Sequence, residues 1–204
     1  EPRVLVHTLS AFQDCPLIDQ VVVVTREDLL LEVGRLCQDF ALHKVTKVVV
    51  GGRERIHSVQ AGLRELPPDA PLIAIHDGAR PLVSQRVLEE AIRRATATGA
   101  AAPAVPVTDT IKRGEEGRIV ETVDRSTLFA VQTPQVFEEG LIRAAIQGAL
   151  QAGELLTDDC AAVERLGMPV ALTEGSRENI KITTPFDLVL GEAILQAREE
   201  GTLG

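Results

Sequence analysis

Cysteine, long apolar runs and positive charge are all scarce in this sequence of 204 residues. Its three cysteines, Cys15, Cys37 and Cys160, are widely spaced among apolar neighbours, which favours reduced core thiols over disulfides or a metal site. No apolar run is long enough to cross a bilayer, and no basic segment precedes an apolar leader. We therefore expect a cytoplasmic protein that does not associate with membranes.

The shortage of positive charge restricts the possible partners. A net charge of −9 argues against nonspecific nucleic-acid binding, which needs a broad basic face. Most of the 21 basic residues are arginines, and lysine occurs only at Lys44, Lys47, Lys112 and Lys181. An anionic ligand must therefore be bound by a local cluster of arginines and lysines.

The first half of the chain alternates predicted strands and helices. Apolar runs over 20–25, 45–50 and 71–76 predict strands, and the four consecutive valines of the first run are typical of a strand buried on both faces. Helical spacing predicts helices over 2–12, after a capping Thr25, from Ser58 to Pro67, and over 84–97. Such alternation predicts right-handed crossovers. We expect a Rossmann-like α/β fold, with a mostly parallel sheet and helices on both faces.

The second half departs from this alternation. After a strand of small residues over 101–107, polar and apolar residues alternate from Thr108 to Arg125 around a glycine-rich turn, which predicts a hairpin. We expect residues 108–126 to form a β-arm that projects across a subunit interface, or else a solvent-exposed flap. Beyond it we predict a polar return, three helices, and short strands over 169–173 and 179–183. No linker interrupts the sequence, which predicts a single domain over 1–204.

A strong candidate for chemistry is the stretch from Ile73 to Pro81. Here an apolar run ends at Asp77, a glycine and Arg80. Ligands of open α/β sheets bind beyond the carboxyl ends of the strands, where a carboxylate can hold a divalent cation and an arginine can hold a phosphate. The residues alone leave open a second interpretation, in which Asp77 caps the turn and Arg80 is solvated.

Other candidate groups give weaker signals. The segment from Gly51 to Ser58 joins a strand to a helix, where backbone amides favour anions. Lys181 either points toward a phosphate or protects an edge strand from aggregation. The histidines lack metal-ligand spacing and are interpreted as structural or solvated. The adjacent acids Asp158 and Asp159 are explained most simply by helix capping.

Several short motifs occur in a definite order along the chain. They are Gly51-Gly52-x-x-Arg55-x-x-Ser58-Val59, His76-Asp77-Gly78-Ala79-Arg80-Pro81, Pro106-Val107-Thr108-Asp109-Thr110-Ile111-Lys112, Val123-Asp124-Arg125 with Gln132-Thr133-Pro134-Gln135, Thr157-Asp158-Asp159, and Asn179-Ile180-Lys181-Ile182-Thr183. In this combination, over residues 1–200, the chain resembles the 2-C-methyl-D-erythritol 4-phosphate cytidylyltransferase family.

The resemblance implies a nucleotidyltransferase that moves CMP from CTP to 2-C-methyl-D-erythritol 4-phosphate and releases pyrophosphate, in the methylerythritol phosphate pathway of isoprenoid biosynthesis. It implies catalytic roles for Lys181 and for Asp77, which would also bind Mg²⁺. The residues implied to hold the cytidine are Gly52, Arg53 and Ser58. The residues implied to hold the methylerythritol phosphate are Arg80, Thr110, Arg125 and Thr133. The arm would reach into a second subunit, so that the sites of a homodimer are shared.

One departure from the family pattern bears on activity. The glycine-rich loop of the family, which follows a first strand and has a lysine shortly beyond it, would precede Glu1. We therefore expect a molecule of residues 1–204 alone to lack its first core strand and to be nearly inactive. Three alternatives stay open: ribitol-5-phosphate cytidylyltransferase, a sugar-1-phosphate nucleotidyltransferase, and a nucleotide-binding module without turnover.

Overall fold

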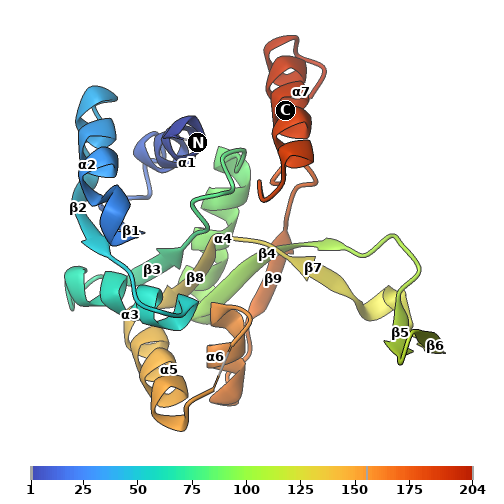
Figure 1. Cartoon of the computed structure of the whole chain (residues 1–204). Helices are drawn as coiled ribbons and strands as arrows, with labels where there is room; N and C mark the ends of the chain where they lie inside the picture. The colour runs from blue at the N-terminus through green and yellow to red at the C-terminus, as the bar shows by residue number, and fades with distance from the viewer. Residues whose placement is uncertain (1, 155, 204) are drawn as a thin grey trace.

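Helices and strands alternate along most of the chain, as Figure 1 shows for the computed structural model, which describes residues 2–154 and 156–203. The helices are α1 (Pro2–Gln13), α2 (Leu30–Asp39), α3 (Arg55–Glu65), α4 (Gln85–Thr98), α5 (Glu139–Ala152), α6 (Asp159–Arg165) and α7 (Pro185–Glu199). The strands are β1 (Val21–Thr25), β2 (Val45–Val50), β3 (Leu72–Ile75), β4 (Ala100–Pro106), β5 (Lys112–Glu115), β6 (Arg118–Thr122), β7 (Phe129–Val131), β8 (Gln135–Glu138) and β9 (Ala171–Glu174). Short 3-10 turns cover Glu27–Leu29 and Arg125–Thr127.

The central sheet has the strand order β3-β8-β4-β7, with β9 also paired to β4. Strand β9 runs parallel to β4, whereas β8 runs antiparallel to both β3 and β4, and β7 runs antiparallel to β4. Because β3 and β4 both oppose β8, they run in the same direction. Strands β1 and β2 form a separate parallel pair. The predicted α/β class is confirmed.

Helices cover both faces of the central sheet. Neighbouring residues of a strand point to opposite faces, and the two core clusters divide accordingly: Phe137 packs with residues of α3, α5 and α6, whereas Val136 packs with residues of α1 and α4. Both side chains are fully buried. Each face therefore has its own apolar layer, as expected for a sheet between two sets of helices.

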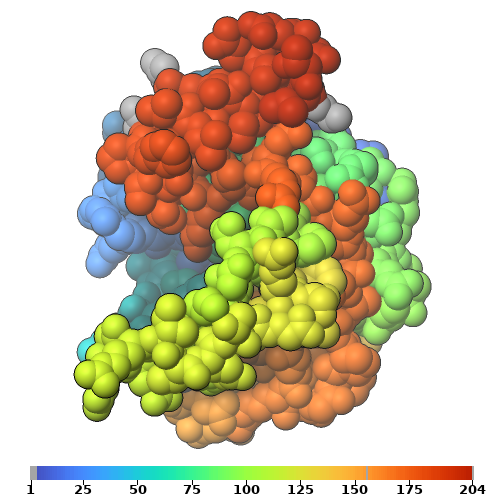
Figure 2. Space-filling view, turned by 90° about the vertical axis from the view of Figure 1, so that its right-hand side faces the viewer, coloured from blue at the N-terminus to red at the C-terminus, as the bar shows by residue number. Residues whose placement is uncertain are grey.

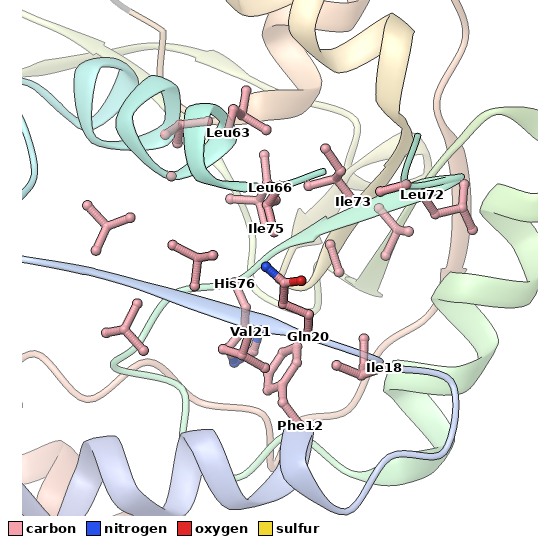
Figure 3. Close-up of a pocket in the computed structure, with 18 of the residues that line it drawn as sticks. Phe12, Ile18, Gln20, Val21, Leu63, Leu66, Leu72, Ile73, Ile75 and His76 are labelled. Atoms are coloured by element: carbon pink, nitrogen blue, oxygen red, sulfur yellow. The ribbon is translucent and has the colours of Figure 1, made fainter. Parts of the chain in front are cut away.

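An apolar slot separates β1 from β3. Its volume is about 700 Å³, and all four residues of β3 line it together with residues of β1. Figure 3 shows α3 on one side of the slot, with Leu63 and Leu66 turned toward it, and Phe12 of α1 on the other side. Within the described residues, β1 pairs only with β2 and β3 pairs only with β8. The slot thus lies between two strand edges and two helices.

Strands β5 and β6 form the predicted antiparallel hairpin, in which every residue is exposed. Figure 1 shows the hairpin far from β3 and α3, and Figure 2 shows the same segment, in yellow-green, extending beyond the rest of the surface. No buried side chain fixes the hairpin to the sheet, because its residues contribute nothing to the three core clusters of the described chain. Its use as an intersubunit arm stays a prediction.

Local sequence signals explain where the longer helices begin and end. Ser84 caps α4 by accepting a hydrogen bond from the backbone of Val87, and Gly99, with φ of 83°, ends the helix in a left-handed conformation. At α7, Thr184 and Asp187 form a reciprocal capping box. Among the described residues, no helix combines the length and the apolar character needed to cross a membrane.

Three local predictions are wrong. The segment 179–183 is irregular and not a strand, because the fully buried Asn179 is held by its own side-chain bonds and Ile182 bonds to the backbone of Ala79. The segment predicted as a return over 131–135 does not reverse the chain, because β7 before it and β8 after it both run antiparallel to β4. Thr25 is the last residue of β1 and does not cap a helix, since the following 3-10 turn begins after Arg26.

Candidate active site

The Asp77 carboxylate lies directly beyond β3 and has three cationic neighbours. Its Oδ2 atom is 3.1 Å from Lys181 Nζ and 3.6 Å from Arg80 Nε, and its Oδ1 atom is 3.9 Å from an Arg55 Nη2 atom. Partial burial raises the pKa of Asp77, but the hydrogen bond and charge of Lys181, followed by the charges of Arg55 and Arg80, lower it further. The pKa of Asp77 therefore lies below its ordinary value, and the group is ionised at neutral pH.

A chain of hydrogen bonds fixes the turn that carries Asp77. The Thr133 hydroxyl accepts from the backbone N–H of Asp77 at 3.1 Å and lies 3.0 Å from Nδ1 of His76. The other ring nitrogen of His76 lies 3.1 Å from the carbonyl oxygen of Arg80. If Nε2 carries the proton, His76 donates to Arg80 and accepts from Thr133, so that every group in the chain has a partner. The sequence interpretation of His76 as structural agrees with this arrangement.

Lys181 reaches Asp77 from an irregular segment that is anchored on both sides. Before it, the Asn179 amide donates to the carbonyl oxygen of Thr133 at 2.9 Å, and the Asn179 carbonyl accepts from Arg80 at 2.6 Å. After it, the Ile182 backbone donates to Ala79. The segment from 179 to 182 is thus tied directly to the turn after β3, which explains how a residue about one hundred positions away meets Asp77.

Arg55, the first residue of α3, makes a two-pronged ion pair with Asp159, the first residue of α6. Its Nη1 and Nη2 atoms donate to the two carboxylate oxygens at 2.8 and 2.6 Å. Burial raises the pKa of Asp159, and the hydrogen bond and charge of Arg55 oppose that rise. Capping explains only Asp158, which accepts from the backbone of Ala161. The capping role predicted for Asp159 is therefore wrong, because its carboxylate binds Arg55, and no role was predicted for Arg55.

The loop after β2 brings Gly52 and Ser58 together. The Gly52 N–H donates to the Ser58 hydroxyl at 3.1 Å. A Cβ atom at position 52 would lie 2.2 Å from the Cβ atom of His57, so only glycine fits this close approach. The side chain of Arg53 is 92% exposed. Ser58 and Asp77 both line the slot, which therefore opens at the candidate site.

Thr110 and Arg125 lie elsewhere. Both are exposed, and Arg125 donates a hydrogen bond to the carbonyl oxygen of Thr108 beside the hairpin. The described contacts of these two residues include none with Asp77, Arg80 or Lys181. Of the predicted site residues, the structure brings together Asp77, Arg80, Lys181 and Thr133, with Gly52 in the neighbouring loop after β2 and Ser58 in the first turns of α3. It leaves Arg53 pointing into solvent.

Comparison with known proteins identifies the family of the chain. Residues 1–197 match the family model described as 2-C-methyl-D-erythritol 4-phosphate cytidylyltransferase. This chain belongs to that cytidylyltransferase family. The resemblance seen in the sequence is confirmed, and members of the family are nucleotidyltransferases.

Relatives and solved structures agree with this membership. The cytidylyltransferase of Halalkalibacterium halodurans is 45% identical over 196 residues, covering 96% of this chain and 86% of the relative. That of Desulforamulus reducens is 46% identical over 201 residues, covering 96% and 84%. The crystal structure of the Thermus thermophilus cytidylyltransferase is 36% identical, with a TM-score of 0.82 over 95% of this chain and 89% of its own. The synthase structure from Anaerococcus prevotii has a TM-score of 0.86 at 29% identity, over 95% and 86%.

The carboxylates of the candidate site suit a metal ion that is held partly by the substrate. Among the described residues, no group of three or more histidine, cysteine, aspartate or glutamate side chains is placed to hold a metal ion by itself. Asp77 offers a single carboxylate that is 18% exposed. Mg²⁺ is commonly held by one or two carboxylates together with substrate phosphates and water. The residues present therefore fit a Mg²⁺ ion that arrives with a nucleotide, and do not fit a permanent metal centre.

The environment of His76 predicts how stability depends on pH. Burial lowers the pKa of His76 to about 4 from an ordinary 6.5. Between these values the unfolded chain binds a proton that the folded chain excludes, so the free energy of unfolding should fall as pH falls from 6.5 to 4, by on the order of 3 kcal/mol at most. Urea unfolding of the chain and of His76→Gln over this range measures the effect.

The variant should lose most of this pH dependence. His43→Gln serves as the matched control because His43 is exposed, and it should keep the dependence. If the free energy of unfolding falls below pH 6.5 as steeply in His76→Gln as in the unchanged chain, this pH dependence does not come from His76.

Proposed function

We propose that this chain transfers CMP from CTP to 2-C-methyl-D-erythritol 4-phosphate and releases pyrophosphate, in the methylerythritol phosphate pathway of isoprenoid biosynthesis. The observation that carries the proposal is that the side chains of Lys181 and Arg80 both lie within 4 Å of the Asp77 carboxylate, beyond the end of β3, in a chain of this family. This cluster of cations lies in a chain whose net charge is −9. The cations must therefore serve a local purpose.

The reaction needs positioning and charge neutralisation more than covalent help from the protein. A phosphate oxygen of the methylerythritol phosphate attacks the α-phosphorus of CTP, a new P–O bond forms, and the bond to pyrophosphate breaks. The 46% exposed Lys181 ammonium can leave Asp77 and donate to the α-phosphate as its charge grows. Arg80 is 14% exposed, and it would hold the phosphate of the alcohol together with Thr133.

Asp77 is the residue that we assign to the divalent cation. When bound, Mg²⁺ neutralises the phosphate charges that would otherwise repel the incoming alcohol phosphate. Gly52 and Ser58, joined by their hydrogen bond, would hold the cytidine, and Arg53 would contribute through its backbone because its side chain points into solvent. These assignments explain why the loop after β2 begins with two glycines.

The direct test is pyrophosphate release by the complete protein that contains residues 1–204, with CTP, Mg²⁺ and either alcohol phosphate. We expect turnover with 2-C-methyl-D-erythritol 4-phosphate. Turnover only with ribitol 5-phosphate would establish the alternative substrate, and binding of CTP without turnover on either would establish a non-catalytic module.

Lys181→Ala should lower kcat by about 10²- to 10³-fold, the size of the loss when one donor to a charged transition state is removed. The matched control is Lys47→Ala, since Lys47 makes a surface ion pair with Glu65 at 2.7 Å and is not among the cations that pair with Asp77. A fall of less than tenfold for Lys181→Ala would remove Lys181 from the catalytic assignment.

We also propose a cytoplasmic homodimer in which the β5–β6 hairpin acts as an arm. The hairpin is fully exposed, and the two predicted substrate ligands beside it, Thr110 and Arg125, lie away from Asp77 in their own chain. Ligands for one phosphate must converge, so these residues would serve the site of a second copy. Each active site would then combine Lys181 of one subunit with Arg125 of the other.

Mixing two impaired variants, at an alcohol phosphate concentration well below the raised KM, tests this sharing. Lys181→Ala and Arg125→Ala should each be impaired, and the second should raise KM for the alcohol phosphate. After their subunits are mixed and allowed to exchange, half of the dimers are hybrids with one intact site, so about a quarter of the original activity should return. No recovery, in a mixture shown to contain hybrid dimers, would mean that each site is built from one chain.

Residues 1–204 would form a single domain, with 108–126 as the arm. An added strand between β1 and β3 would complete the central sheet of this domain. The slot between β1 and β3 is apolar, is enclosed by α1 and α3, and has a strand edge on either side. One extended segment of about five residues, at 3.3 Å per residue, would span strands of this length. It would bond to both edges and join β1 and β3 into one sheet. Its end would emerge beside Ser58 and Asp77, where a further loop could contact the nucleotide phosphates.

Amide hydrogen exchange tests the slot. A soluble peptide with five alternating valine and alanine residues between terminal lysines should slow exchange at the amides of β1 and β3 that do not bond to β2 or β8. A peptide of the same length with a central proline should protect less, because proline donates no ladder bond. Equal exchange with and without the first peptide at saturating concentration would contradict strand insertion.

A further inference from the structure

We propose that Arg55 and Asp159 are positioning residues for Asp77, and that Asp159 holds the Arg55 guanidinium at a distance that leaves one oxygen of Asp77 free for a divalent cation. This inference rests on the proposed function, which assigns the cation to Asp77. It gives a purpose to a buried ion pair that the reaction itself does not use.

The two oxygens of Asp77 have different neighbours. Lys181 at 3.1 Å and Arg80 at 3.6 Å both approach Oδ2, whereas Arg55 alone approaches Oδ1, at 3.9 Å. A separation of 3.9 Å is too long for a hydrogen bond. Oδ1 is therefore the oxygen that a metal ion can take without first displacing a hydrogen-bonded ammonium group.

Asp159 is the reason that Arg55 comes no closer. It takes two donors of the guanidinium at 2.8 and 2.6 Å, and its own side chain is only 2% exposed. The side-chain oxygen of Gln135 accepts from the backbone N–H groups of both Asp159 and Cys160, at 3.0 Å each. Gln135 is itself 2% exposed within β8. The carboxylate that holds Arg55 is thus fixed to the central sheet.

Arg55 is fixed from the other side by its place in α3. Because Arg55 is the first residue of α3, the helix holds its backbone in place. Only rotation about its side-chain bonds can bring the guanidinium from one carboxylate to another. The third acid nearby, Asp158, is already engaged, because it accepts from Ala161 and from the Gln135 amide. If the charge of Asp159 is removed, Asp77 is the remaining partner, and a close Arg55–Asp77 pair would occupy Oδ1.

The test is a Mn²⁺ titration of the chain with CTP present and no alcohol phosphate, monitored through the paramagnetic broadening of the Gly78 and Ala79 amide signals in NMR spectra. Asp159→Asn keeps the size of the side chain and one acceptor oxygen. It should raise the Mn²⁺ concentration for half-broadening about tenfold, the size expected from one added close charge interaction between partly exposed groups. The double variant Arg55→Gln with Asp159→Asn should return to within about twofold of the unchanged chain, by the same charge argument.

The double variant separates positioning from a structural role. If Asp159 merely held α6 in place, the second substitution would restore nothing, and that outcome would overturn the inference. So would an unchanged midpoint in Asp159→Asn, or a lack of broadening at Gly78 in the unchanged chain. Glu139→Gln is the matched control, because Glu139 also pairs with a partly buried arginine, Arg143, but on α5. Its midpoint should not move.

Turnover in the complete protein distinguishes this inference from the proposed function. There, Asp159→Asn should raise the Mg²⁺ concentration for half-maximal rate while kcat at saturating Mg²⁺ stays within about twofold, since only cation binding is weakened. If broadening follows the expected order of variants but no alcohol phosphate is turned over, the positioning role stands and the proposed reaction fails.

Discussion

The requirement that buried polar groups find partners organises this molecule around one short segment, Gln132 to Gln135. All four of its residues are almost fully buried, and each of the three polar side chains bonds to a different part of the chain. Gln132 bonds to Ser176 and Asn179, Thr133 to the turn of Asp77, and Gln135 to the start of α6. Leaving such a group without its partner costs about 1–3 kcal/mol. The candidate site therefore depends on a segment of which only Thr133 is proposed to contact a ligand.

Positive groups outnumber negative ones among the ion pairs that involve Asp77. Asp77 faces Lys181, Arg80 and Arg55, while Asp159 neutralises one of these cations. The excess suits a ligand that brings several phosphate charges. Because Arg80 is also tied to the backbone of Asn179, the cations on the two sides of Asp77 have different freedom. Arg80 is held in place, whereas Lys181 is nearly half exposed and can move toward a ligand.

Local patterns in the sequence were sufficient for most helices, for the existence of the four-valine strand and for the position of Asp77 beyond β3, because each depends on neighbours a few positions away. The prediction that the valine strand is buried on both faces was wrong, since only Val23 of β1 is buried. Local patterns failed where side-chain hydrogen bonds replace the backbone hydrogen bonds of a strand or a helix end. Asn179-Ile180-Lys181-Ile182-Thr183 alternates as a strand would, yet the buried Asn179 amide fixes it and no strand forms there. The polar residues before β8 are typical of an exposed loop, yet in the structure they are buried. Arg55 and Asp159 meet across 104 positions, which no local pattern reveals.

The slot between β1 and β3 has a practical consequence for handling the protein. It places two strands with unsatisfied backbone edges next to each other, in a setting that is apolar and about 700 Å³ in volume. Exposed strand edges recruit strands from other molecules, and runs of β-branched residues such as Val21–Val24 do so readily. Self-association should therefore rise with protein concentration, and a dilute, cold sample is the form in which this chain is best kept.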